Sequence, residues 1–162
     1  MLRYIGIGIF SVCISLIGFH MSFKADREMR TRRELIELIC SIQSGIRYGA
    51  LSLTEICRNF PACELKKCGF YDELIKSSHP DLKNALMKSH AIISNEAADL
   101  FCSFADNCGK STFSEEEIKN CDKYISLFEQ LDKKLSEKEN TKKLLYSKLG
   151  ILAGILSCIL LL

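Results

Sequence analysis

Residues 34–49 read ELIELICSIQSGIRYG, and the apolar side chains in this stretch recur every three or four positions. That spacing places them along one face of an α-helix, whereas a half-buried strand would alternate apolar and polar residues. Gly49 stands where a glycine in the left-handed conformation commonly ends a helix. We therefore predict an amphipathic helix that packs into a core and ends at Gly49. Its predicted core residues are Leu35, Leu38, Ile39, Ile42 and Ile46.

The remaining sequence also favours helices. Its 162 residues include two prolines and no tryptophan, and no segment sustains an alternation of apolar and polar residues. Residues 52–55 and 114–117 have the spacing of a capping box, in which a serine caps the helix and a glutamate returns to the serine amide. We expect an all-α protein whose central part is a bundle of about six helices. Other predicted helices cover residues 63–77, 80–90 and 94–108, the last ended by Gly109.

The last predicted helix changes character along its length. Its first part carries an apolar stripe, whereas residues 136–143, SEKENTKK, contain no apolar side chain. Such a segment cannot bury a face, so we expect it to leave the bundle as a solvated helical stalk. A flexible linker is the alternative. The stripe consists of Ile118, Cys121, Ile125, Phe128, Leu131 and Leu135.

Both ends of the sequence are apolar enough to suggest membrane helices. Residues 4–23 contain one ionisable side chain apart from tyrosine, and approach the ~20 residues needed to cross a bilayer. Residues 149–162 carry no charged side chain, but cover only ~21 Å as a helix. We expect a transmembrane helix in residues 1–23, a helical bundle domain with its stalk in 24–148, and a short membrane helix in 149–162. A cleaved signal peptide is the alternative for the first apolar run.

Basic residues beside the apolar runs predict the orientation. Lysine and arginine are enriched on the cytoplasmic side of membrane helices, and only Arg3 lies on the outer side of either run. We therefore expect the central domain in the cytoplasm and the protein in the cell membrane. The inner basic residues are Lys24, Arg27, Arg30, Arg32, Arg33, Lys138, Lys142, Lys143 and Lys148.

Small residues recur at steps of three and four in both apolar runs. Such residues let helix backbones approach closely in lipid, although glycine and serine are also common in membrane helices generally. We predict that the two segments pack against each other or against partner helices. The residues concerned are Gly8, Ser11, Ser15 and Gly18 in the first run, and Ser147, Gly150, Gly154 and Ser157 in the second.

Enzymatic signatures are missing from the sequence. The triplet at residues 109–111, GKS, lacks the upstream glycine and the preceding strand of a phosphate-binding loop. None of the three histidines stands in a known nucleophile signature. The net charge is +2, and bases and acids intermix. We therefore expect no catalytic residue, no cofactor, no small-molecule substrate and no nucleic-acid partner.

The nine cysteines are odd in number, and Cys13 and Cys158 lie in the apolar ends. Reduced thiols in a cytoplasmic domain fit this distribution better than a disulfide scaffold does. The remaining cysteines lack the close CxxC pairs of a zinc site, so we expect no metal. A thiol- or metal-responsive membrane regulator is nevertheless the alternative function that the cysteine count suggests.

Three segments carry a resemblance to a known family: residues 46–55, IRYGALSLTE, residues 104–109, FADNCG, and residues 148–162, KLGILAGILSCILLL. In this order they are similar to the "YG-x-x-P-L-x-E-A" turn, the "FG-x-x-LG" and the closing "LGVLGG" tail of the stage III sporulation protein AB family of endospore-forming bacteria. The order of the segments and the two apolar ends also match. The departures from the family pattern are Ser52 for proline, Ile56 for alanine, Ala105 for glycine and Cys108 for leucine.

The resemblance implies a non-enzymatic protein of the mother-cell membrane around the forespore. Its cytoplasmic bundle would be similar to those of the type II secretion platform protein F, and would work in the channel apparatus beside a secretion-type ATPase and other membrane subunits. A hidden hydrolase is a further alternative. The motif positions carried over are Tyr48, Gly49, Leu53, Glu55, Phe104 and Gly109, each of which also has a structural interpretation as cap or core.

Overall fold

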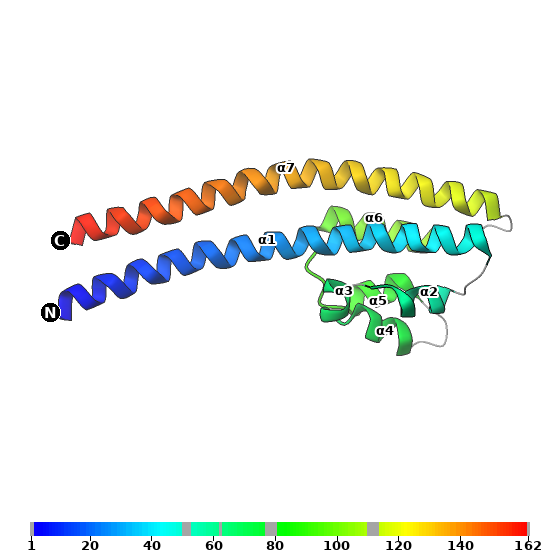
Figure 1. Ribbon diagram of the computed structural model, residues 1–162, viewed down its shortest axis with the longest axis horizontal. Helices are drawn as coiled ribbons and strands as arrows, with labels where there is room; N and C mark the ends of the chain where they lie inside the picture. Colours follow the sequence, from blue (N-terminus) through cyan, green and yellow to red (C-terminus); the bar gives the residue numbers. More distant parts are fainter. Residues whose placement is uncertain (1, 50–52, 62, 77–80, 110–113, 162) are drawn as a thin grey trace. The chain divides into compact units, whose positions relative to one another are not determined.

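The computed structural model describes residues 2–49, 53–61, 63–76, 81–109 and 114–161. Within these ranges all regular secondary structure is α-helical, which confirms the all-α prediction (Figure 1). The ranges contain seven helices: α1 (Leu2–Tyr48), α2 (Leu53–Asn59), α3 (Glu64–Lys67), α4 (Phe70–Lys76), α5 (Leu82–Lys88), α6 (Asn95–Asn107) and α7 (Ser114–Leu161).

The chain divides into two compact units. One consists of Met1–Asp26 together with Leu135–Leu162, and the other, the bundle, is Arg27–Lys134. α1 and α7 each contribute residues to both units. Residues 136–143 are helical, as the stalk prediction requires, and they belong to α7 rather than to a flexible linker.

The two expected membrane segments are the first part of α1 and the last part of α7. Among the described residues, no helix has the length and apolar character required to cross a membrane. The predicted packing of the small residues in these segments concerns side chains that are not among those described. That prediction concerned Gly8, Ser11, Ser15, Gly18, Gly150 and Gly154.

The predicted apolar face of residues 34–49 forms one wall of the bundle core. Leu35, Leu38 and Ile39 are fully buried and Ile42 is nearly so, while Ile46 packs against the core from its edge. These positions follow the helical repeat, so α1 turns a continuous stripe inward. The prediction of this core face is confirmed.

α1 and α7 run antiparallel in the bundle and are joined by polar contacts at both ends of the pairing. The Gln43 amide donates to the Asp122 carboxylate at 2.6 Å, and Arg32 Nε donates to Asp132 Oδ1 at 3.1 Å. The Arg32 side chain is completely buried. A buried guanidinium needs a carboxylate partner, so this ion pair fixes the register of the two helices.

Aromatic rings connect α4, α6 and α7 in the middle of the core. Phe70 packs on Phe101 with ring centroids 6.1 Å apart, and Phe101 packs on Phe104 at 6.0 Å. Phe104 meets Tyr124 at 5.5 Å in an edge-to-face arrangement, which is favoured by the ring quadrupoles. The Tyr124 hydroxyl donates to the Ser103 carbonyl at 3.1 Å, so its polar end is also satisfied.

The single helix predicted over residues 63–77 is wrong, because two short helices occupy this region. Gly69 has φ +81° between α3 and α4, a backbone conformation that only glycine adopts without strain. Ser94 accepts a hydrogen bond from the Ala97 amide, which confirms the predicted start of α6. Gly109 has φ +77° just beyond α6, as expected for a glycine that ends a helix.

The start of α3 is capped by a side chain from another helix. Glu34 of α1 accepts hydrogen bonds from the backbone amides of Cys63, Glu64 and Leu65 at 3.0, 2.9 and 2.8 Å. These amides have no intrahelical partner at a helix start. A carboxylate from a helix distant in the sequence therefore supplies the cap that Cys63 does not provide itself.

Candidate docking pocket

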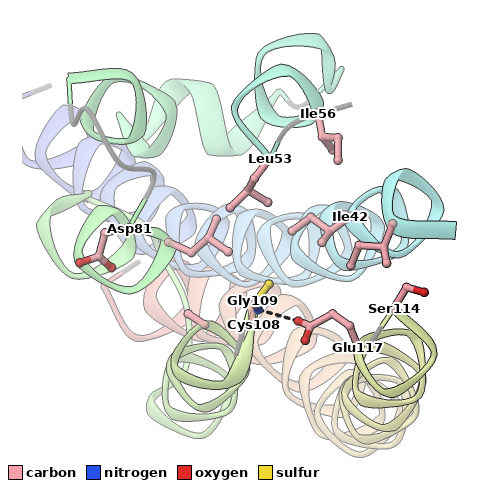
Figure 2. A pocket seen from close by; sticks show the side chains of 11 residues that line it. Ile42, Leu53, Ile56, Asp81, Cys108, Gly109, Ser114 and Glu117 are labelled. Atoms are coloured by element: carbon pink, nitrogen blue, oxygen red, sulfur yellow. Dashed lines mark hydrogen bonds between the residues drawn. The ribbon is translucent and has the colours of Figure 1, made fainter. Parts of the chain in front are cut away.

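A pocket of about 490 Å³ lies in the bundle where α1 and α6 end and α2 and α7 begin (Figure 2). Ile42 of α1 and Leu53 and Ile56 of α2 give it apolar walls. Its acidic groups are Asp81, at the start of α5, and Glu117 in the first turn of α7. A pocket of this size, mainly apolar with few polar groups, is typical of a binding site.

Glu117 holds the end of α6 against the start of α7. Its Oε1 accepts a hydrogen bond from the Gly109 backbone amide at 2.6 Å (Figure 2). The positive φ of Gly109 turns the chain at this point, where a residue with a side chain would be strained. Glu117 is only 6 % exposed, and its second oxygen, Oε2, is covered and has no hydrogen-bond partner among the described residues.

The capping box predicted at residues 114–117 assigned Glu117 the wrong partner. The carboxylate bonds the Gly109 amide across the connection rather than returning to the amide of Ser114, which is itself the first residue of α7. Glu115 and Glu116 are exposed beside it, where acidic groups favour the positive end of the helix dipole. Three consecutive glutamates look alike in the sequence, so the buried one could not be told from the two exposed ones. The corresponding box at residues 52–55 includes Ser52, which lies outside the described residues.

The family model described as stage III sporulation protein AB matches residues 3–162. The chain belongs to the stage III sporulation protein AB family. It is therefore a sporulation protein, and the resemblance seen in the three sequence segments is confirmed. Comparisons with curated proteins and with solved structures give no match.

Described residues of two family motifs in the bundle border the pocket. Ile46 and Leu53, from the motif at residues 46–55, line one side. Cys108 and Gly109, from the motif at residues 104–109, line the opposite side. About fifty positions separate these motifs in the sequence, and the fold brings them to a single site.

The other motif positions lie elsewhere. Phe104 is fully buried in the aromatic core, which gives it a structural place. Gly49 has φ +61° and ends α1, as predicted from the sequence. Glu55 is exposed on α2, and Tyr48 is 78 % exposed. Of the predicted motif residues, the fold therefore brings Leu53 and Gly109 together at the pocket.

Tyr48 borders a second, neighbouring hollow of about 530 Å³ between α1 and α2. Gly45 allows the two helices to approach here, because a Cβ at this position would collide with Ile56 Cδ1. Ile56 lines both hollows. The position of α2 on α1 therefore shapes the pocket and the surface around Tyr48 together.

Four cysteines of the bundle, Cys40, Cys68, Cys102 and Cys121, are poorly suited to redox sensing. Burial raises the thiol pKa of Cys40, Cys68 and Cys102, and burial together with the nearby Glu117 carboxylate raises the pKa of Cys121 to about 11. A raised pKa reduces the thiolate fraction, and the thiolate is the reactive form. Within the described ranges, no three His, Cys, Asp or Glu side chains are grouped so that they could hold a metal ion.

Proposed function

We propose that this sporulation protein is a non-enzymatic, membrane-held assembly subunit whose bundle docks a partner protein at the pocket between its two family motifs. The partner class is a secretion-type ATPase or another membrane subunit of the channel between mother cell and forespore. The observation that carries the proposal is that Ile46 and Leu53 of one motif and Cys108 and Gly109 of the other line one mainly apolar pocket. The family resemblance supplies the class of partner.

The membrane location is part of this proposal and is supported by the sequence. Residues 4–23 and 149–162 are almost free of charge, and lysine and arginine flank them on the side of the central domain. The positive-inside rule then favours a cytoplasmic bundle. A bundle held at the mother-cell membrane would present its pocket to cytoplasmic partners.

The chemistry of the pocket supports docking rather than catalysis. Its described lining includes Ser114 and Cys108, which are nucleophile types, but no histidine to act as their base. Its carboxylates are those of Asp81 and Glu117, and Asp81 already caps α5 by accepting from the Asn84 amide at 3.0 Å. An apolar pocket with few polar groups is better suited to receiving side chains of a partner.

Site-specific photocrosslinking in sporulating cells tests the docking role. A photoreactive amino acid replaces Leu53 in the full chain, and the control chain carries it at Met87, an exposed residue of α5 that does not line the pocket. We expect position 53, and not position 87, to crosslink a secretion-type ATPase or another membrane subunit of the channel. Recovery of neither from position 53, or equal recovery from both positions, would refute docking at this pocket.

A further inference from the structure

We propose that the group received by the pocket is a basic side chain, an arginine or lysine with an apolar neighbour, presented by the partner protein. This inference rests on the proposed docking role and adds the chemistry by which the partner is recognised. It is carried by the state of Glu117, the buried acid at the pocket wall.

Glu117 has one satisfied oxygen and one unsatisfied oxygen. Oε1 accepts the Gly109 amide at 2.6 Å, whereas Oε2 is buried with no hydrogen-bond partner in the described structure. A buried carboxylate is stable only when it is paired or fully hydrogen-bonded. The second oxygen has no donor among the described residues, but it is itself covered. A group entering the pocket can therefore pair with it once the Glu117 carboxylate turns toward the pocket that it lines.

The other residues that line the pocket favour an arginine or lysine as the hydrogen-bond donor to Glu117. Ile42, Leu53 and Ile56 offer apolar surface that fits the methylene stem of an arginine or lysine. Asp81 adds a second acidic group to the lining, and no lysine, arginine or histidine belongs to the described lining. The acidic groups of the pocket thus complement the charge of a cation, and its apolar walls complement the methylene stem.

Other occupants fit less well. An anionic group would meet Glu117 and Asp81 without a basic residue in the described lining to offset them. A purely apolar group would seal the pocket and leave Oε2 of Glu117 buried without a donor. A guanidinium or ammonium group both fills the space and donates to that oxygen.

Titration of the purified full chain in detergent micelles tests the inference directly. The probe is the blocked dipeptide N-acetyl-leucyl-arginine amide, and the reporter is the NMR signal of the Gly109 amide, which is bonded to Glu117. The matched probe carries citrulline, which has the shape of arginine but no charge. We expect a saturable shift with the arginine probe and about tenfold weaker binding of the citrulline probe. Equal binding of the two probes would overturn the proposal.

Two variants test whether the negative charge that binds the arginine probe is that of Glu117. Glu117→Gln keeps an oxygen that can accept the Gly109 amide, and we expect it to weaken the arginine probe about tenfold. Glu115→Gln makes the same change of charge on the exposed side of the same helix turn, and its affinity should stay within about twofold. Equal losses in the two variants would show general charge attraction and overturn the inference. The comparison of arginine with citrulline uses the unchanged chain, so it holds even if a variant folds poorly.

Lys110 directly follows Gly109 in the sequence, so it is a basic residue of the chain itself that could compete with the partner for Glu117. We expect Lys110→Gln to bind the arginine probe as the unchanged chain does. Binding that appears only in Lys110→Gln would show that the acid is already paired within the chain, and would overturn the proposal.

The photocrosslinking experiment separates this inference from the docking role. We expect Glu117→Gln to reduce the crosslink from position 53 about tenfold, while Glu115→Gln leaves it unchanged. A crosslink that persists in full in Glu117→Gln would uphold docking and overturn the basic anchor. Absence of the crosslink in the unchanged chain would refute docking itself.

Discussion

Cys121 shows how a single buried residue can be made chemically inert. It is fully buried opposite α1, and burial together with the carboxylates of Glu117 and Asp122 raises its thiol pKa to about 11. Cys63, by contrast, is exposed at the start of α3. The two cysteines therefore form an internal comparison of accessibility.

We predict that iodoacetamide at pH 8 modifies Cys63 and leaves Cys121 intact. With a pKa of about 11, only about one Cys121 thiol in a thousand is ionised at that pH, and its burial further slows attack. Peptide mass spectrometry after timed quenching measures both sites in the same sample. Both should react when the chain is unfolded in urea, which serves as the control. Native Cys121 reacting as fast as Cys63 would contradict the burial described above.

At the scale of elements, α3 depends on α1 for its cap. Glu34 accepts three backbone amides at the start of α3, a helix of only four residues. A helix this short has little stability of its own. The link to α1 therefore positions α3, and through it the chain that continues into α4.

We predict that Glu34→Ala destabilises the bundle by about 1–2 kcal/mol, because several amides lose a charged acceptor. Urea unfolding measures the free-energy change, and hydrogen exchange should show the loss of protection at the Glu64 and Leu65 amides. Glu37→Ala, on the exposed side of the same helix, is the matched control and should change stability little. Unaltered exchange at α3 in Glu34→Ala would show that the cap does not hold this helix.

The buried helix faces and several helix ends could be predicted from the sequence. Helical periodicity predicted the buried face of α1 and the last stripe, in which Cys121 and Phe128 are buried. Local signals also predicted that α6 starts near Ser94 and that Gly109 ends it. These features depend on neighbours along the chain, which is why a single sequence reveals them.

Long-range contacts were beyond the same reasoning. Glu34 and Glu117 each bond amides of another segment, and nothing in their immediate neighbours distinguishes them from exposed acids. The role of Gly69 was missed because an isolated glycine is tolerated within helices, and only its positive φ reveals the break. The pocket was unpredictable for a related reason, since its walls come from five helices or their ends.

At the scale of the whole bundle, Glu64 couples stability to pH. Burial alone raises its pKa, but hydrogen bonds from Lys67 and Arg27, each 3.2 Å long, outweigh burial and leave the pKa below its ordinary value. A lowered pKa means that the folded state binds this proton less tightly than the unfolded chain does. The stabilisation is therefore present above the unfolded pKa of about 4.3 and is lost as the pH falls through the folded pKa.

We predict that Glu64→Gln weakens the acid sensitivity of folding. Urea unfolding at a series of pH values from about 6 downward should show a smaller loss of stability below about pH 4.3 than in the unchanged chain. Glu73→Gln is the control: its pKa is also lowered, by a hydrogen bond from Lys76, but that lysine is largely exposed and the pair is screened by solvent. An acid profile identical in Glu64→Gln and the unchanged chain would remove Glu64 as a source of the pH dependence.

The aromatic core provides the protein with a natural optical reporter. The chain has no tryptophan, so its near-ultraviolet spectrum is dominated by five tyrosines, of which Tyr71 and Tyr124 are buried. Tyr124 lies edge-on to Phe104 and bonds Ser103, in an asymmetric setting that gives a tyrosine ring strong circular dichroism. Loss of tertiary packing around α6 and α7 will therefore be visible in solution without an attached dye, even where helix content stays constant.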